Sequence, residues 1–414
     1  MRILARRKVE ISFKEVSAIY SYIFHKNKTD NKKILKFEEQ FSRYIGVKYA
    51  ITVPSGRIGL SILLENFGFK YGDEVIISSY NYPVIPALIK TKGLKPIFLD
   101  VDPQTYNINT SLIKESITSK TRCIIATHLF GRTCDIEEIM NICKEYNLIL
   151  IEDVAHACGA EYKNIKLGNF GDASYFSFGT GKALVAFGGG MLVTNNNLIF
   201  EKIRTNLNSS TFLYNKYFFR GFMKAFFEVV CTNRIIFSLF VYPVIFFATL
   251  IGSSFLDKLT DDRDILEEVT LNKETSPFNG IQAAVGIIQL DRLDEMNDRR
   301  IYYARMLSRL LGDIDEIRAI PTGTDRTNIA LYYCIFSKQA KELRKFLALR
   351  GVDTKKGSMK ACSSLGYFDN RNKCPIAEEI SENIIELPCY PSLTPEEIYY
   401  QANLIREFYG DNKC

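Results

Sequence analysis

Residues 148–182 read LILIEDVAHACGAEYKNIKLGNFGDASYFSFGTGK, and this stretch decides the fold. It opens on an apolar run that closes with Glu152 and Asp153. A second apolar run covers 173–178 and leads into a glycine-rich turn that carries Lys182. Short apolar runs bounded by turn residues are typical of buried strands. We therefore predict two strands whose carboxyl ends lie next to charged residues.

Similar runs occur on both sides of this stretch. They predict further strands at 49–53, 74–78, 95–100, 123–128 and 191–195. Helical periodicity lies between several of these runs, as in DIEEIMNICKEY at 135–146. Strands that alternate with helices predict an α/β fold, here with a mixed, mostly parallel seven-stranded sheet covered by helices. Ligands of such sheets collect at the carboxyl ends of the strands, where Asp153 and Lys182 are expected.

Composition sets the class of protein. The chain has 414 residues, of which 47% are hydrophobic, and this length suggests two domains around a large core. Its 53 basic and 47 acidic side chains leave a net charge of +6 and are interspersed, apart from a basic N-terminal run, so no nucleic-acid partner is expected. The 10 cysteines form no C-x-x-C pair, and with 3 histidines they predict neither a metal site nor a disulfide framework. A reducing compartment fits this pattern, and no apolar run before Glu10 indicates a secretory signal.

One segment departs from the α/β pattern. Aromatic residues are frequent from 211 to 256, and 235–256 (IIFSLFVYPVIFFATLIGSSFL) contains no charged residue. About 20 apolar residues suffice to cross a bilayer as a helix. Because the segments before and after it belong to one folded body, a single crossing is excluded. Three alternatives remain: a re-entrant or in-plane hairpin bent at Pro243, two crossings with 212–230 as the partner, or a buried subunit interface. Basic residues that suit an anionic lipid surface flank or interrupt its first half, namely Lys216, Arg220, Lys224 and Arg234.

Lys182 and Asp153 are the pair that a pyridoxal phosphate enzyme needs. A lysine amine holds the aldehyde of that cofactor as a Schiff base, and a carboxylate keeps its pyridine nitrogen protonated. His156, three residues after Asp153, is placed to hydrogen-bond the cofactor's ring oxygen. Taken singly, each residue also has a structural explanation: a helix N-cap for Asp153, a satisfied structural histidine for His156 and a surface position for Lys182.

Other residues fit the phosphate and the ring of this cofactor. The turn PSGRI at 54–58 follows a predicted strand and opens a predicted helix, so its backbone N–H groups form a candidate phosphate site at Gly56, Arg57 and Ile58. Ser177 adds a hydroxyl to that site, and Tyr82 offers an aromatic face for stacking. The structural alternatives are a simple connector at 54–58 and a core or interface tyrosine.

Together these residues carry a resemblance to a known family. The chain resembles the DegT/StrS family of pyridoxal-phosphate-dependent sugar aminotransferases over about 35–200, and the resemblance resumes at Gln282. The matching motifs are Ser55-Gly56-Arg57, GDEVI at 72–76, KPIFLDVD at 95–102, HLFG at 128–131, EDVAH at 152–156, SFGTGK at 177–182, QAAVG at 282–286, QLDRL at 289–293 and LPCYP at 387–391.

The resemblance implies a fold-type I aminotransferase that is a homodimer with an active site at each subunit interface. It implies that an amino acid, by resemblance glutamate, gives its nitrogen to a ketone on a sugar. The hydrophobic segment suggests a narrower hypothesis, in which the keto-sugar is nucleotide-linked or lipid-linked and serves the synthesis of a cell-surface glycan or lipid. The implied roles are Schiff-base lysine and proton shuttle for Lys182, the pyridine nitrogen for Asp153, the ring oxygen for His156, stacking for Tyr82, and the phosphate for Gly56, Arg57, Ile58 and Ser177.

We expect five segments along the chain. They are an N-terminal extension (1–34), a large cofactor-binding domain (35–210), a hydrophobic insertion (211–262), the end of the large domain with a connecting helix (263–300) and a smaller C-terminal α+β domain (301–414). We expect a cytoplasmic protein, and the insertion suggests a peripheral or monotopic position on the cytoplasmic membrane face.

Two departures from the family pattern leave other functions open. Arg57 stands where the family usually has threonine, and TSPFN at 275–279 replaces an Asn-Tyr-Arg loop that reaches the partner subunit's phosphate. Lys182 argues against the family's dehydratases, which have histidine in its place. Two rivals remain: a non-catalytic, membrane-tethered sensor that binds the cofactor or a sugar, and another pyridoxal phosphate chemistry on a lipid precursor.

Overall fold

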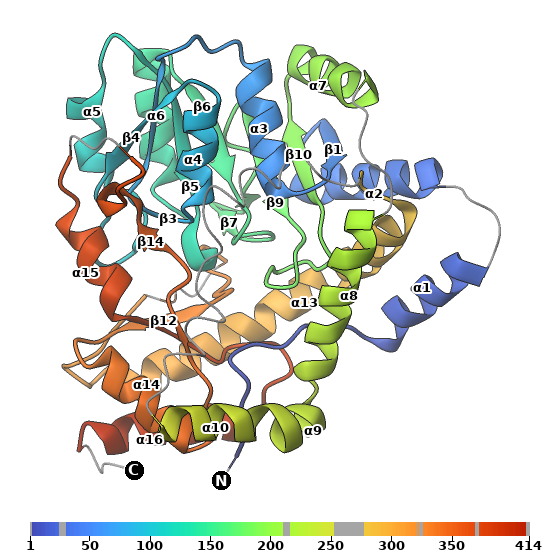
Figure 1. The fold of residues 1–414 in the computed structure, drawn as a ribbon. Coiled ribbons are helices and arrows are strands. Elements are labelled where there is room, and N and C mark those ends of the chain that lie inside the picture. Colours follow the sequence, from blue (N-terminus) through green and yellow to red (C-terminus); the bar gives the residue numbers. More distant parts are fainter. Residues whose placement is uncertain are drawn as a thin grey trace.

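A seven-stranded sheet forms the centre of the molecule (Figure 1). The computed structural model describes residues 2–24, 30–209, 216–251, 277–320, 322, 326–368 and 372–410. The strands lie in the order β1-β10-β9-β6-β5-β2-β4. Their bounds are Tyr49–Val53 (β1), Glu74–Ser78 (β2), Lys95–Leu99 (β4), Thr121–Thr127 (β5), Ile149–Asp153 (β6), Ala173–Ser177 (β9) and Gly190–Thr194 (β10).

All strands of this sheet run in one direction except β10. The pairs from β4 through β2, β5 and β6 to β9 are parallel, whereas β10 is antiparallel to both β9 and β1. Parallel neighbours need a long crossover, usually a helix, but antiparallel neighbours can be joined directly. The chain therefore passes from β9 to β10 through the loop 178–189 without a helix, and this loop carries Lys182.

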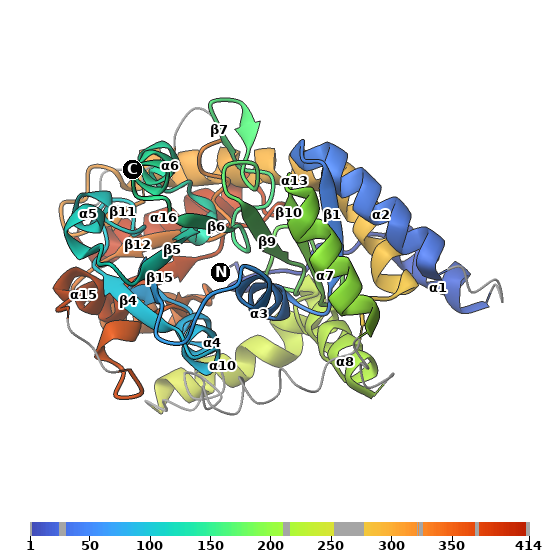
Figure 2. The ribbon, with the colours of Figure 1, turned by 90° about the horizontal axis from the view of Figure 1, so that it is seen from above.

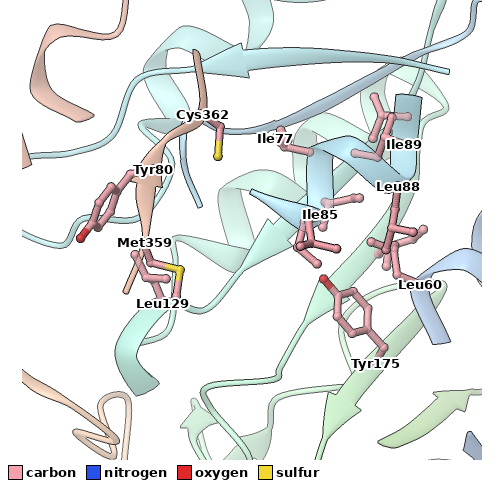
Figure 3. Packing of buried hydrophobic residues seen from close by; sticks show 14 of the residues in the cluster. Leu60, Ile77, Tyr80, Ile85, Leu88, Ile89, Leu129, Tyr175, Met359 and Cys362 are labelled. Atoms are coloured by element: carbon pink, nitrogen blue, oxygen red, sulfur yellow. The ribbon is translucent and has the colours of Figure 1, made fainter. Parts of the chain in front are cut away.

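Helices cover both faces of the sheet (Figures 1 and 2). Side chains alternate across it: Val75 and Ile77 pack in the core with α3 and α4, and Ile76 packs in the core with α6 on the other face. Figure 3 shows Ile85, Leu88 and Ile89 of α4 near Leu60 of α3. The helices are α2 (Asp30–Ile45), α3 (Gly56–Asn66), α4 (Val84–Thr91), α5 (Ile113–Ser116), α6 (Ile136–Tyr146), α7 (Asn197–Ser209) and α13 (Gly280–Leu311).

A second, four-stranded sheet follows α13 in the chain. Its strands are β11 (Arg318–Ala319), β12 (Tyr333–Phe336), β15 (Ile384–Leu387) and β13 (Lys355–Lys356), in that order, and all their pairings are antiparallel. The helices α14 (Ala340–Leu349), α15 (Pro375–Asn383) and α16 (Pro395–Phe408) belong to this part. The N-terminal segment joins it, because Leu4 forms a parallel bridge with Val352, and α1 (Phe13–Phe24) follows.

Two short pairings complete the strands. β14 (Lys360–Ala361) pairs with β3 (Tyr80–Asn81) and so joins the C-terminal part to the large sheet, and β7 (Glu161–Tyr162) pairs with β8 (Ile165–Lys166). Met359 and Cys362, on either side of β14, pack near Tyr80 and Leu129 (Figure 3).

The apolar segment forms an angle of two helices along one edge of the molecule (Figures 1 and 2). α8 (Lys216–Cys231) is followed by α9 (Arg234–Ile236), a π-helical turn at Phe237–Val241 and α10 (Tyr242–Leu250). Among the described residues no single helix is long and apolar enough to span a membrane. The helical stretches Phe222–Cys231 and Arg234–Leu250 reach that length and apolarity only when they are taken together, and a bend of 67° separates them. α10 packs on α14, where the hydroxyl of Tyr242 donates to the carbonyl of Ala348 at 3.1 Å.

The predicted α/β architecture with a mostly parallel seven-stranded sheet is confirmed. Each predicted strand is present, with bounds that differ by at most two residues. The domain boundaries stay predictions, and 210–215 and 252–276 of the predicted insertion and its flank lie outside the described residues.

Candidate active site

Charged residues at the carboxyl edge of the large sheet line one cavity. Its volume is about 360 Å³, which lies within the range of about 300–1,000 Å³ that is common for small-molecule sites. The structure thus brings Lys182 and Asp153 together, although they come from different loops and strands. The other predicted site residues that line this cavity are Gly56, Arg57, Tyr82, His156 and Ser177.

Ile58 does not line this cavity. Its backbone N–H donates to the hydroxyl of Ser55 at 3.2 Å, so it is used by the N-cap of α3. Its side chain borders a separate depression between α3 and α7.

Asp153 ends β6 and is only 7% exposed. Its Oδ1 accepts the N–H of Ala155 at 3.0 Å. Burial raises the pKa of this carboxyl above its ordinary value, and Lys182 is among the groups that oppose the rise. A cationic group would stabilise the ionised form of a buried carboxyl in this position.

Backbone hydrogen bonds within the loop 178–189 hold the segment that carries Lys182. The carbonyl of Phe178 accepts the N–H groups of Ala186 at 2.9 Å and Gly188 at 3.1 Å. The hydroxyl of Tyr332 donates to the carbonyl of Gly181 at 2.6 Å, which ties the loop to the C-terminal part. Burial, together with the cations Arg57, Lys355 and Arg7, lowers the pKa of Lys182 to about 8, although Asp153 opposes this.

Close packing of α3 on β9 places the residues of the predicted phosphate site. A Cβ atom at Gly56 would lie 3.1 Å from both the carbonyl oxygen of Phe176 and the Cβ of Ser177. Glycine therefore lets the first turn of α3 approach β9 directly. Arg57 and Ser177 line the same cavity as Gly56, and they supply a cation and a hydroxyl that suit a phosphate.

His156 is buried with an unused ring nitrogen. Its Nδ1 has no hydrogen-bond partner among the described residues. Burial lowers the pKa of His156 well below its ordinary value, with Lys182 and Lys355 adding to the effect, so the ring is neutral. Phe130 stacks near the ring at 6.2 Å between centroids, and Tyr332 meets its edge at 5.5 Å. These two rings fix the orientation of the imidazole at the cavity wall.

Glu152 supports the site from the other side of β6. Its carboxylate accepts the N–H groups of Gly168, Phe170 and Gly171 at 2.8–3.0 Å and lies 3.2 Å from the Nε2 of His128. Although burial alone raises the pKa of Glu152, the hydrogen bonds from His128 and the backbone lower it. The Nδ1 of His128 accepts the N–H of Cys134, so Nε2 carries the proton that is donated to Glu152.

Several lining residues were not predicted. Asn81 follows the predicted strand 74–78, and Thr127 lies at the end of the predicted strand 123–128. Their position at the carboxyl ends of strands could have indicated them. Tyr175 and Thr180 belong to the predicted strand 173–178 and to the turn after it. The others come from distant segments and include Arg7, Lys224, Glu228, Tyr332, Ser358 and Met359. Lys224 and Glu228 left one signal, because they are oppositely charged residues one helical turn apart on α8.

The sequence comparison decides the family. A sequence model of the DegT/DnrJ/EryC1/StrS aminotransferase family matches residues 12–220 and 274–406. The chain belongs to this family. The predictions of the family, of an aminotransferase and of pyridoxal phosphate as its cofactor are confirmed.

Relatives of this DegT-family chain cover most of its length. GDP-perosamine synthase of Escherichia coli O157:H7 is 28% identical over 383 residues, which are 91% of this chain and 90% of the relative. The structure of Helicobacter pylori PseC, an aminotransferase involved in the biosynthesis of pseudoaminic acid, has a TM-score of 0.78 at 22% identity and covers 99% of this chain and 100% of its own. E. coli GDP-4-keto-6-deoxy-D-mannose-3-dehydratase with bound hydrated PLP has a TM-score of 0.76 at 20% identity and covers 98% and 100%. The predicted fold type I is confirmed.

The residues of this DegT-family cavity fit pyridoxal phosphate. A lysine of lowered pKa, a buried carboxylate, and a histidine whose Nδ1 has no hydrogen-bond partner among the described residues line this cavity. The segment 275–279 stands in place of the family's Asn-Tyr-Arg loop. The structure describes its residues 277–279, whereas Thr275 and Ser276 lie outside the described residues. Phe278 covers Gly189 and stacks on Phe37, and Asn279 is the N-cap of α13.

Proposed function

We propose that this chain is a sugar aminotransferase that moves an amino group from glutamate to a ketone on a sugar. The observation that carries the proposal is the position of Lys182 and Asp153 on the wall of one cavity, with His156 and Arg57 beside them. The names of the relatives support the sugar as substrate, since one is a perosamine synthase and another an aminotransferase of pseudoaminic acid biosynthesis.

Each residue has a proposed task. When it is bound, pyridoxal phosphate supplies an electron sink that makes the proton on the adjacent carbon acidic. The Nζ of Lys182 holds the cofactor and then moves that proton, which its lowered pKa of about 8 permits near neutral pH. Asp153 holds the pyridine nitrogen in its protonated form, and His156 donates to the ring oxygen. Tyr82 stacks on the ring, while Gly56, Arg57 and Ser177 bind the phosphate; we propose no contact for the side chain of Ile58.

We further propose that the enzyme is a homodimer whose active sites lie at the subunit interface. The family supports this assembly. Of the described residues that replace its Asn-Tyr-Arg loop, Phe278 does not offer the same contact, because it is buried against Gly189 and Phe37. Arg57, which lines the cavity within one chain, supplies a cation where a threonine is usual. Size-exclusion chromatography with light scattering measures the assembly, and a monomer at micromolar concentration contradicts it.

We also propose that α8–α10 contact the cytoplasmic face of a membrane, where the substrate serves glycan or lipid synthesis. The outer side chains of this helix pair are apolar and exposed, with Phe227 at 67%, Phe240 at 68% and Phe247 at 64%. No charged residue occurs from Ile235 to Leu256, and a helix satisfies its own backbone groups, so a lipid interface is a suitable partner for this face.

The experiment for the chemistry is a screen of nucleotide-linked keto-sugars with glutamate as donor, followed by mass spectrometry of the products. We expect an amino-sugar and 2-oxoglutarate from the wild type and neither product from Lys182→Ala. Circular dichroism checks that the variant is folded. Turnover by Lys182→Ala at the wild-type rate, or no 2-oxoglutarate from the wild type with any keto-sugar, contradicts the proposal.

The experiment for the membrane contact is co-sedimentation of the full chain with anionic vesicles. We expect the wild type in the vesicle pellet and the variant Phe240→Asp with Phe247→Asp in the supernatant. The matched control is Leu198→Asp on α7, an exposed apolar residue away from α8–α10, which should sediment like the wild type. Wild-type protein that stays in the supernatant refutes the contact.

A further inference from the structure

Helix α8 is docked on the loop 178–189, which carries the proposed catalytic lysine. The ring of Phe222 on this helix lies 5.3 Å from the ring of Phe187 in the loop. Ala225, one turn further along, packs in one cluster with the same Phe187. Apart from 216–220, α8 lies in a part of the chain that the family model does not match. The support that this helix gives to the loop is therefore an addition to the family pattern.

The turn at the start of this loop is rich in glycine. Gly179 and Gly181 flank Thr180, and the N–H of Lys182 donates to the carbonyl of Gly179 at 3.1 Å. No described atom lies within 4 Å of the place that a Cβ would take at Gly179, so the turn is open at this point. Glycine loses more backbone freedom on ordering than any other residue, which makes such a turn costly to fix. Contacts from outside the turn therefore determine whether the amine of Lys182 keeps one position.

Glu228 of α8 supplies two of these contacts. Its carboxylate accepts the hydroxyl of Thr180 at 2.5 Å and forms an ion pair with Arg7 of the N-terminal segment. The Nη1 of Arg7 lies 3.0 Å from the position that a Cβ at Gly181 would take, so the guanidinium covers the turn. The side chain of Glu228 is only 14% exposed, and a hydrogen bond to a charged group is roughly twice as strong as one between neutral groups. A third contact comes from the C-terminal part, where the hydroxyl of Tyr332 donates to the carbonyl of Gly181 at 2.6 Å.

We propose that Glu228 is a positioning residue for Lys182. By accepting the hydroxyl of Thr180 and pairing with Arg7, it holds the turn 179–182 so that the amine faces the cavity. Glu228 and Lys182 line the same cavity, so the contact acts where the amine is used. An amine that is held in one position reacts more readily than one that samples many, because less conformational freedom is lost on reaction. The inference rests on the proposed role of Lys182 and adds a second residue to that role.

The test is capture of pyridoxal phosphate by the full chain. The cofactor is added at increasing concentration to protein freed of it, and borohydride then reduces the bond between cofactor and lysine to a stable amine. Peptide mass spectrometry gives the fraction of Lys182 that carries the pyridoxyl group. Loss of the charged contacts in Glu228→Ala should raise the cofactor concentration at half-labelling by about tenfold. The matched control is Glu145→Ala on α6, which removes an exposed carboxylate paired with Lys114 and should label like the wild type.

Two further variants separate positioning from a general weakening of the fold. Glu228→Gln keeps an oxygen that can accept the hydroxyl of Thr180 but lacks the charge that pairs with Arg7. Its half-labelling concentration should therefore fall between those of the wild type and Glu228→Ala. Thr180→Val removes the hydroxyl alone. Because Glu228→Ala already removes the same hydrogen bond, the double variant should need no more cofactor than Glu228→Ala.

The possible failures give different results. Equal half-labelling concentrations in the wild type and Glu228→Ala, or factors that multiply in the double variant, overturn the positioning role and leave the proposed function standing. If circular dichroism shows that Glu228→Ala does not fold, an unchanged concentration in both Glu228→Gln and Thr180→Val overturns it in the same way. A wild type in which Lys182 never carries the pyridoxyl group rejects instead the proposed role of Lys182 itself.

Discussion

The charges around Lys182 set the pH at which its amine can react. Burial, Arg57, Lys355 and Arg7 lower its pKa from the ordinary 10.5 to about 8 against the influence of Asp153. Only the neutral amine captures an aldehyde. At pH 7.5 about a quarter of the amine is then neutral, compared with about one molecule in a thousand at the ordinary value, which is roughly a 200-fold gain in reactive lysine.

Substitution of the neighbouring charges should shift this pKa in opposite directions. Arg57 repels the protonated amine, so Arg57→Gln should raise the pKa of Lys182 and reduce its reactivity at neutral pH. Asp153 stabilises the protonated amine, so Asp153→Asn should lower the pKa and increase the reactivity of the free amine. The second variant should nevertheless be a poor enzyme, because it loses the proposed partner of the pyridine nitrogen.

The assay is trace acetylation of the apoenzyme with acetic anhydride between pH 6 and pH 11, with each lysine quantified by peptide mass spectrometry. Lys341 is exposed and serves as the reference lysine within the same sample. The labelling midpoint of Lys182 is expected at about pH 8. A midpoint for Lys182 equal to that of Lys341, or shifts of the same sign in Arg57→Gln and Asp153→Asn, would refute the electrostatic argument.

Four further predictions concern stability and can be measured by urea unfolding. Gly189→Ala places a Cβ 2.4 Å from the ring of Phe278, at a backbone φ of +85°. It should lower the free energy of unfolding by about 2–4 kcal/mol. Gly366→Ala is the control and should lower it far less, because no atom lies within 4 Å of the added Cβ. In the background of Phe278→Ala the cost of Gly189→Ala should shrink, and an unchanged cost would show that the close contact is not its cause. In Glu152→Gln the side-chain NH₂ group faces backbone N–H groups of the turn 168–171, so two donors meet. This substitution should lower the free energy of unfolding by about 3 kcal/mol. Because the pKa of Glu152 is lowered in the folded state, its contribution is present above the ordinary value of 4.5 and is lost as the pH falls below it, so the difference between Glu152→Gln and wild type should narrow in acid.

The strands of the large sheet were predictable because each is a short apolar run between turn residues. The same holds for Asp153 and Lys182, since a carboxyl end of a strand and a glycine-rich turn are local features. Arg7, Lys224 and Tyr332 reach the cavity from segments far apart in sequence, and no local pattern encodes that approach. Ile58 was predicted from a helix start alone, but the hydroxyl of Ser55 already takes its N–H.

The apolar segment shows the limit of a hydropathy argument. The uncharged run at 235–256 has the length of a membrane span, but length does not tell whether the helix is continuous. Asn233 begins a new helix, because its side chain accepts the N–H groups of Ile235 and Ile236, and a π-helical turn follows at 237–241. The chain therefore turns by 67° and packs α10 on α14. The helix N-cap at Asn233 and the packing of α10 on α14 thus determine the bend in this segment, which composition alone does not predict.

The separation of Glu152 from Asp153 follows from the two-residue period of a strand. On β6, Asp153 lines the cavity and Glu152 points to the opposite face, where the turn 168–171 and His128 satisfy its carboxylate. On β9 the same alternation puts Tyr175 and Ser177 in the cavity wall and Phe176 in the core beneath α2. A slip of one residue in either register would exchange these sets, burying Asp153 in the turn and directing Glu152 to the cofactor. The pairing of Asp153 with Tyr175 and of Ser177 with Gly190 therefore fixes the chemistry, because it determines which carboxylate and which hydroxyl the loop of Lys182 can meet.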